Sequence, residues 1–403
     1  MKNRSKVSAV IEAAVVFALV FVTSFYDVFY SFDSLLRDKL YQTPRGINNK
    51  IKIIAIDDET LREYGPFGTW SRGVYADIIN TLGEYPAAVA MDIMVFGDMD
   101  SEGDKALSEA CRNSGRVVAG SYISYTSAYK TDENGKPYID RFHIEQIEQP
   151  IVAADCITGF VNASPDDDGI VRSAFLTVSA PELYGDESFG SLAAETYYLY
   201  CKNTGTAANN PTLDDNGRMW ISYAGRPGDY EHISMSSLLD GSVDPRIFTD
   251  CIVLVGAYAS GLQDQFSVPN SSDQMFGVEI HANIIQGLLD GKCPVPANRV
   301  LSALAAAAAA VLVYLISKYS KVKISTPIII VMTAAYIAAG VMLNGSGLTI
   351  PILYAPLFMV ICYLVNLGRK YAEEAIEKRK ITAAFKKYVA PQVVEEIAKS
   401  GSY

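Results

Sequence analysis

Hydrophobic residues are concentrated in four stretches of the chain, each close to the length of about 20 residues with which an α-helix crosses a bilayer. The last three follow one another with short loops between them, so burial inside a soluble domain does not account for them. Residues 303–313 are rich in alanine, which allows close helix packing, and Pro351 and Pro356 are expected to kink the last helix. Transmembrane helices are therefore predicted at residues 7–26, 299–317, 324–343 and 348–367.

The first stretch has two interpretations. Its basic lead, "MKNRSK", is typical of a signal peptide, but the apolar run is long, Glu12 interrupts it and no A-x-A site follows. We therefore favour an uncleaved anchor. Glu12 is then near enough to the interface to reach lipid headgroups or to pair with Lys6.

Basic residues indicate how the helices are oriented. They occur in residues 1–6, in the loop at 318–323 and after residue 368, whereas the loop at 344–347 carries no charge. Because Lys and Arg mark the cytoplasmic side, both termini are predicted to be cytoplasmic. The expected location is a bacterial plasma membrane, with lipid as a partner, crossed several times, and residues 27–298 outside it.

The outer segment alternates between strand and helix patterns. Amphipathic helices are predicted at 71–85 and 277–291, with Ser71 and Gly291 at their ends, and a hairpin at 158–178 with its turn at 164–169. The pattern predicts an extracellular α/β layered domain with a mixed, partly parallel sheet. Its buried strands are expected at residues 51–57, 87–96, 116–120 and 251–257.

Charge and cysteine content narrow the function of this domain. Residues 31–298 carry 38 acidic against 19 basic residues, a net charge of −19. Such a surface excludes nucleic acid as a partner; it suits solubility, or the attraction of cations. Five of the six cysteines lie outside the predicted spans and form no C-x-x-C, so we expect no disulfide framework, although one or two bridges remain open.

Several polar residues follow the predicted strands directly. Ligands collect at the carboxyl ends of parallel strands, so one cleft would hold Asp57, Asp58, Arg72, Asp92 and Asp264. The structural alternative is helix capping, for which Asp58 is well placed. Under the ligand hypothesis, removing Asp57 or Asp92 abolishes stabilisation by the ligand.

Two further features of the sequence bear on metal and cofactor chemistry. "SPDDDG" makes Asp166 and Asp168 candidate cation ligands, but its spacing is not that of an EF-hand, and a polar turn with Gly169 at positive φ is commoner. His281 lies on an apolar helix face and is expected to be a satisfied core residue. No zinc or nucleotide motif accompanies them.

Six blocks of the outer segment resemble, in the same order, the CHASE extracellular sensor domain of type two. They are "IAIDDETLREYGPFGTWSRGVYADIINTL", "AVAMDIMVFGD", "GFVNASPDDDGIVRSAFL", "SLAAE", "IVLVGAYASGLQDQFSVP" and "GVEIHANIIQGLLDG". The resemblance implies a sensor for an unknown extracellular small ligand or stimulus, followed by three membrane helices. It also implies an output by a class III nucleotide cyclase, a histidine kinase or a Ser/Thr kinase.

After the last predicted span, apolar residues recur at alternating spacings of three and four. This pattern predicts a parallel coiled coil in a homodimer, although a surface-bound amphipathic helix remains the alternative. Glu374 and Lys378 interrupt the seam as an i, i+4 pair. The transducer, residues 368–403, would continue a seam formed by Leu364, Leu367, Tyr371, Ile381, Phe385 and Tyr388, with a hinge at Pro391.

The final stretch, "FKKYVAPQVVEEIAKSG", resembles the segment that precedes the catalytic domain in CHASE-linked class III adenylate cyclases. The resemblance implies the sensor and transducing half of a receptor cyclase. No catalytic residue is assigned in this chain; Mg or Mn and ATP are expected only for the cyclase domain. A kinase output, a receptor without output and a cell-envelope binding module remain alternatives.

Overall fold

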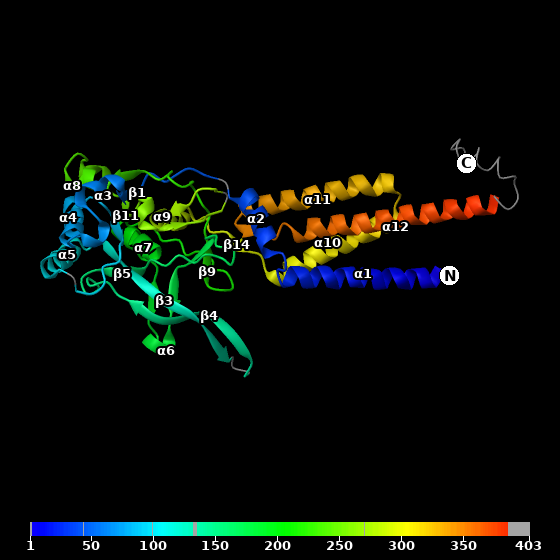
Figure 1. The fold of residues 1–403 in the computed structure, drawn as a ribbon, viewed down its shortest axis with the longest axis horizontal. Coiled ribbons are helices and arrows are strands. Elements are labelled where there is room, and N and C mark those ends of the chain that lie inside the picture. Colours follow the sequence, from blue (N-terminus) through cyan, green and yellow to red (C-terminus); the bar gives the residue numbers. More distant parts are fainter. Residues whose placement is uncertain (1, 43, 99, 132–134, 270, 386–403) are drawn as a thin grey trace. The chain divides into compact units, whose positions relative to one another are not determined.

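The computed structural model describes residues 2–42, 44–98, 100–131, 135–269 and 271–385. The chain divides into two compact units. The α/β unit consists of residues 38–295, and the helical unit of residues 1–37 and 296–403 (Figure 1).

The α/β unit is organised around a seven-stranded sheet in the order β10-β1-β11-β2-β3-β4, with β5 also paired to β3. Only β3 and β4 pair antiparallel; the other pairs are parallel, so the prediction of a mixed, partly parallel sheet is confirmed. The strands are β1 (Ile51–Ile56), β2 (Ala88–Asp92), β3 (Val117–Thr131), β4 (Pro137–Glu148), β5 (Ile157–Phe160), β10 (His232–Ser234) and β11 (Ile252–Ala257).

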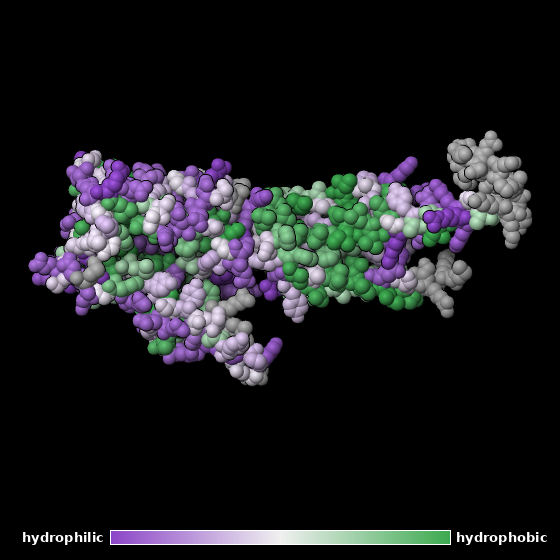
Figure 2. Space-filling view, in the orientation of Figure 1, coloured by the Kyte–Doolittle hydropathy of each residue, from purple (hydrophilic) through white to green (hydrophobic). Residues whose placement is uncertain are grey.

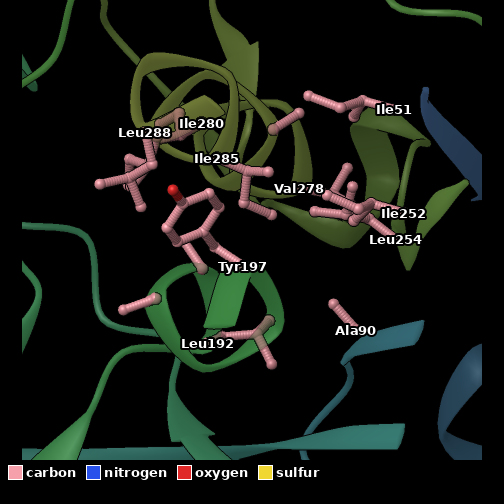
Figure 3. Packing of buried hydrophobic residues seen from close by; sticks show 14 of the residues in the cluster. Ile51, Ala90, Leu192, Tyr197, Ile252, Leu254, Val278, Ile280, Ile285 and Leu288 are labelled. Atoms are coloured by element: carbon pink, nitrogen blue, oxygen red, sulfur yellow. The ribbon is translucent and has the colours of Figure 1, made fainter. Parts of the chain in front are cut away.

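Helices cover both faces of this sheet. One face packs against α7 (Leu192–Thr204) and α9 (Gly277–Asp290); Figure 3 shows Tyr197 of α7 near Ile285 and Leu288 of α9. Burial on two faces explains why the strands are continuously apolar. The opposite face packs against α3 (Asp58–Tyr64), α4 (Gly73–Leu82), α5 (Ser101–Ser114) and α8 (Met235–Leu239).

The predicted hairpin at residues 158–178 is wrong. Its turn exists, since the Asp166 N–H donates to the Ile170 carbonyl at 2.9 Å, but the flanking segments pair elsewhere. The first segment, β5, lies parallel to β3, and β6 (Ser173–Phe175) pairs with β9 (Arg218–Trp220).

Short elements complete the α/β unit. Two further small sheets pair β7 with β8 and β12 with β13. The elements are β7 (Thr177–Ser179), β8 (Ser188–Gly190), β12 (Gln265–Phe266), β13 (Met275–Phe276), α6 (Pro181–Tyr184), η1 (Phe67–Thr69), η2 (Pro245–Phe248) and η3 (Ser260–Leu262).

The helical unit packs around the small residues of α10 (Arg299–Tyr319). Ala306, Ala307 and Ala310 are buried there against Phe358 and Met359, as the alanine-rich pattern predicts. Along the chain, α2 (Tyr30–Tyr41) contains the first boundary between the two units, and β14 (Val295–Pro296) contains the second. The elements are α1 (Lys2–Phe25), α2 (Tyr30–Tyr41), α10 (Arg299–Tyr319), α11 (Val322–Gly345), β15 (Leu348–Thr349) and α12 (Tyr354–Phe385).

Three described helices are long and apolar enough to cross a membrane: α1 from Val7, α10 and α11. Figure 2 shows the mainly apolar surface of the helical unit. The fourth predicted span does not meet that criterion, because α12 begins only at Tyr354. Its apolar part, residues 354–367, is about 21 Å long, against about 30 Å for the hydrocarbon core.

The predicted kinks in this last helix are wrong. Pro351 precedes α12, and Pro356 lies in its first turn, where proline is tolerated. The irregular backbone before α12 is satisfied by the buried Asp33, whose Oδ1 accepts from the N–H groups of Ile352 (2.7 Å) and Leu353 (2.8 Å).

Glu12 joins three helices of this unit. Its carboxylate accepts from Lys318 Nζ at 3.1 Å, from Arg369 Nη1 at 2.7 Å and from the hydroxyl of Tyr314. The expected pairing with Lys6 concerns a side chain outside the described residues. These contacts connect α1 with α10 and α12.

Candidate functional site

The carboxyl edge of the sheet contains a topological switch point. The connection after β11 leads to α9 on one face, whereas the connection after the neighbouring β2 leads to α5 on the other. Where adjacent parallel strands diverge in this way, a crevice forms beyond their carboxyl ends.

A cavity of about 340 Å³ lies in this crevice, within the α/β unit. The segments that follow β2, β5 and β11 surround it, and α9 closes one side. Apolar side chains form much of its wall, among them Phe67, Val161, Phe266, Ile280 and Ile284. Three titratable side chains line it in the described chain: Asp92, Asp264 and His281.

Asp92 is the last residue of β2, and its side chain is only 9% exposed. Its Oδ2 atom has no hydrogen-bond partner among the described residues. Burial raises the pKa of this carboxyl from its usual 3.8 to about 7. When it is ionised, a buried carboxylate without a partner destabilises the folded state unless a ligand or cation binds to it.

Asp264 follows η3 and lies over the first turn of α9. A Cβ on Gly277 would come within 2.5 Å of its carboxylate, so only glycine leaves it room. Burial, followed by the charge of Asp92, raises the pKa of Asp264 to about 6, whereas His281 and the Gly277 N–H act in the opposite direction. The positive end of α9 also favours an anion here.

His281 lies on α9 and its side chain is 7% exposed. Its Nε2 is 3.9 Å from Asp92 Oδ2, too far for a hydrogen bond, and its Nδ1 has no partner in the described part of the chain. Burial lowers its pKa to about 4, so the ring is neutral near pH 7. The prediction of a core histidine is confirmed, but the ring is satisfied only in part: the Val161 backbone hydrogen-bonds to it and opposes the fall in its pKa, whereas Nδ1 has no partner among the described residues.

The other predicted cleft residues lie elsewhere. Asp57 caps α3: its Oδ1 accepts from the Thr60 N–H and the Ser234 hydroxyl, each at 2.9 Å. Asp58, which the capping alternative favoured, is exposed in the first turn of α3. Of the five candidates, the structure brings together Asp92 and Asp264 alone.

Arg72, the remaining candidate, is buried and structural. Its guanidinium donates to the carbonyls of Phe96 and Gly97, at 2.6 Å each, and pairs with Asp104 at 2.8 Å. These contacts hold the loop between β2 and α5, so Arg72 supports one wall of the crevice without lining the cavity.

Asp166 and Asp168 bind a positively charged side chain of the protein itself. Arg172 donates to Asp166 at 3.0 Å and to Asp168 at 2.8 Å, and it also binds Asp38 at 2.8 Å. Gly169 turns the chain at φ 81°, as predicted for a polar turn. No group of three or more metal-ligating side chains was found among the described residues.

The predicted dimer seam follows one side of α12. Leu364, Tyr371 and Ile381 are exposed on it, while Leu367 is half-buried. The predicted pairing of Glu374 with Lys378 is confirmed at 3.6 Å. Phe385 ends the described helix; Tyr388 and Pro391 lie outside the described residues, as does most of the segment at 385–401.

Three helices apolar enough to cross a membrane, beside an α/β unit with an edge cavity, are typical of a membrane protein with a folded domain outside the bilayer. The profile of the CHASE2 domain matches residues 13–317, which is most of the chain. The chain therefore belongs to the CHASE2 family, and CHASE2 is an extracellular sensor domain of receptor-type signalling proteins. No curated protein and no solved structure matches it.

Proposed function

We propose that this chain is the sensing and transducing part of a receptor-type class III adenylate cyclase. The α/β unit would lie outside the bacterial plasma membrane and both termini inside. Family membership and three candidate spans support a membrane receptor. The basic residues flanking the helices support this orientation.

This topology requires α12 to serve as a fourth crossing. Its apolar part is short, but the preceding residues 348–353 extend it. Irregular backbone is tolerated near a membrane where its polar groups are satisfied inside the protein. Asp33 satisfies the N–H groups of Ile352 and Leu353, which favours this arrangement.

The observation that carries the proposal is the continuity of α12. It runs without interruption from Tyr354 to Phe385, starting among buried residues such as Phe358 and Met359. Residues 371–381 are all exposed. A helix that joins a packed bundle to a solvated segment is suited to transmit a displacement. A surface-bound helix would instead have to turn at the interface.

Pairing of two copies would cover the exposed seam of α12. A heptad seam in one chain has no facing holes, whereas a parallel partner supplies them. Two cyclase domains would then meet in a relation set by the helix pair. The sensor would act by favouring one of two arrangements, through a difference in ligand affinity between them.

The cyclase output depends on the resemblance of residues 385–401 alone. The coding sequence after codon 403 tests it directly. A cyclase domain with two metal-binding aspartates is expected there. A kinase domain, or a stop codon, would contradict this part of the proposal and favour one of the alternatives.

Transmission through α12 is tested by changing its helical phase. Inserting two residues after Lys378 rotates the helix beyond that point by about 200°, whereas inserting seven changes the phase by only about 20°. With the protein that includes the expected cyclase domain, in membranes of cyclase-deficient cells, cyclic AMP formation should change strongly with the first insertion and stay near the wild-type rate with the second. Equal rates for both insertions would count against transmission.

A further inference from the structure

The edge cavity combines an apolar wall with a small polar end. Its volume of about 340 Å³ is within the range of pockets that hold small organic ligands, about 300–1,000 Å³. Val161, Phe266 and Ile280 line the wall, and Asp92, Asp264 and His281 lie at the polar end. An occupant should therefore have an apolar body and one polar group.

The polar end offers acceptors. Asp92 Oδ2 and His281 Nδ1 are both buried and have no partner in the part of the chain that the structure describes. The imidazole is neutral near pH 7 and presents one ring nitrogen as an acceptor. An ammonium group has three N–H donors and no acceptor, so it suits these two side chains and Asp264 together.

We propose that this cavity binds a small primary amine with an apolar body, its ammonium group held by Asp92, Asp264 and His281. Calling this amine the stimulus of the receptor depends on the function proposed above. The binding itself does not depend on it.

Two other classes of ligand fit less well. An anionic ligand would be repelled by the two carboxyl groups, which have no basic side chain beside them among the residues that line the cavity. A bare metal ion would leave the apolar wall uncovered, and no described cluster has the side chains to hold one.

Proton competition gives the site a testable pH dependence. The titratable groups facing the ammonium are the two carboxyls, with pKa values near 7 and 6, and His281, which stays neutral above about pH 4. An alkyl amine remains charged up to about pH 10. Its affinity should therefore rise from pH 5.5 to pH 7.5, as the carboxyl groups lose their protons.

The experiment uses the full chain in lipid nanodiscs, with 2-phenylethylamine as the probe and calorimetry as the readout. 2-Phenylethanol and phenylacetate have the same body without the positive charge. We expect the amine to bind, the alcohol to bind at least about tenfold more weakly, and phenylacetate not to bind. Asp92→Asn should weaken amine binding about tenfold or more, whereas the exposed Asp77→Asn should not change it.

The inference is overturned if the amine does not bind at pH 7.5, or if the alcohol binds equally well. It is also overturned if Asp92→Asn and Asp77→Asn bind the amine alike. The outcome is separate from the insertion experiment on α12. If the amine binds but both insertion variants form cyclic AMP at the wild-type rate, the α/β unit binds the amine without transmission through α12. If the amine does not bind but the insertions change the rate, the receptor responds to another ligand.

Discussion

At the residue scale, the main feature of the candidate binding site is a single carboxyl group at the end of β2. Asp92 pairs with Gly256 in the ladder between β2 and β11, and its Oδ2 lies 3.9 Å from Nε2 of His281 on α9. There it is buried without a hydrogen bond to Oδ2. The fold therefore keeps a group that opposes folding when ionised, which is typical of a binding site.

This cost should appear in the pH dependence of stability. The folded-state pKa of Asp92 is raised to about 7, so its contribution is present below about pH 4 and is lost as pH rises through about 7. Asp92→Asn removes that loss. Relative to wild type, the variant should gain stability as pH rises from 5 to 8, by no more than about 3 kcal/mol.

Urea unfolding followed by tryptophan fluorescence measures this difference in the full chain. The only two tryptophans, Trp70 and Trp220, both lie in the α/β unit. His281 has the opposite pH dependence, because its lowered pKa removes stability as pH falls, but it is present in both proteins. If the stability difference between Asp92→Asn and wild type is the same at pH 5 and pH 8, the raised pKa of Asp92 is refuted. Asp77→Asn is the control.

At the scale of elements, the helix ends decide which acidic side chains are left free to line the cavity. Asp57 follows β1 and Asp92 ends β2, but the carboxylate of Asp57 already caps α3 and binds Thr60 and Ser234. Asp264 instead lies at the start of α9, where Gly277 leaves space for it. Two strand ends of similar sequence therefore have different roles.

Replacing Asp57 by alanine should separate these roles. The variant loses an N-cap and the acceptor for two hydroxyl groups, so its free energy of unfolding should fall by about 1–3 kcal/mol. Amine affinity, measured at a temperature where the variant is folded, should equal that of wild type. A loss of affinity as large as that of Asp92→Asn would place Asp57 in the site after all.

At the scale of the whole molecule, the proposed function requires two copies to meet along α12. Ile381 lies on the predicted seam, and Ile376 lies on the opposite side of the same helix. Both are exposed in the single chain, at 41% and 52%. They form a matched pair for testing the dimer.

Cysteine crosslinking in native membranes makes the comparison. Ile381→Cys should form disulfide-linked dimers rapidly upon oxidation, whereas Ile376→Cys should not, because only a/d positions face each other in a parallel pair. The parent chain, with its six cysteines, sets the background. Equal crosslinking at both positions would indicate random collision and reject the seam.

Much of the architecture could be predicted because it depends on local pattern. The strands at β1 and β11, the helices α4 and α9, and the spans α1, α10 and α11 all follow from apolar runs and their periodicity. The hairpin at residues 158–178 failed because strand pairing is not local. A turn signal shows where the chain reverses, and burial then decides which strands pair.

The amino-acid sequence by itself determined which segments are buried, which are long and apolar enough to cross a membrane and where the chain turns, since these depend on side chains close together in the chain. Only the tertiary structure decided the partners. Asp92, Asp264 and His281 meet at a switch point, and Arg172 binds Asp38 across 134 positions. The reason is physical. The type of a buried polar side chain tells which hydrogen-bond or ionic partner it needs, but the packing of distant elements decides whether a protein group or a ligand provides that partner.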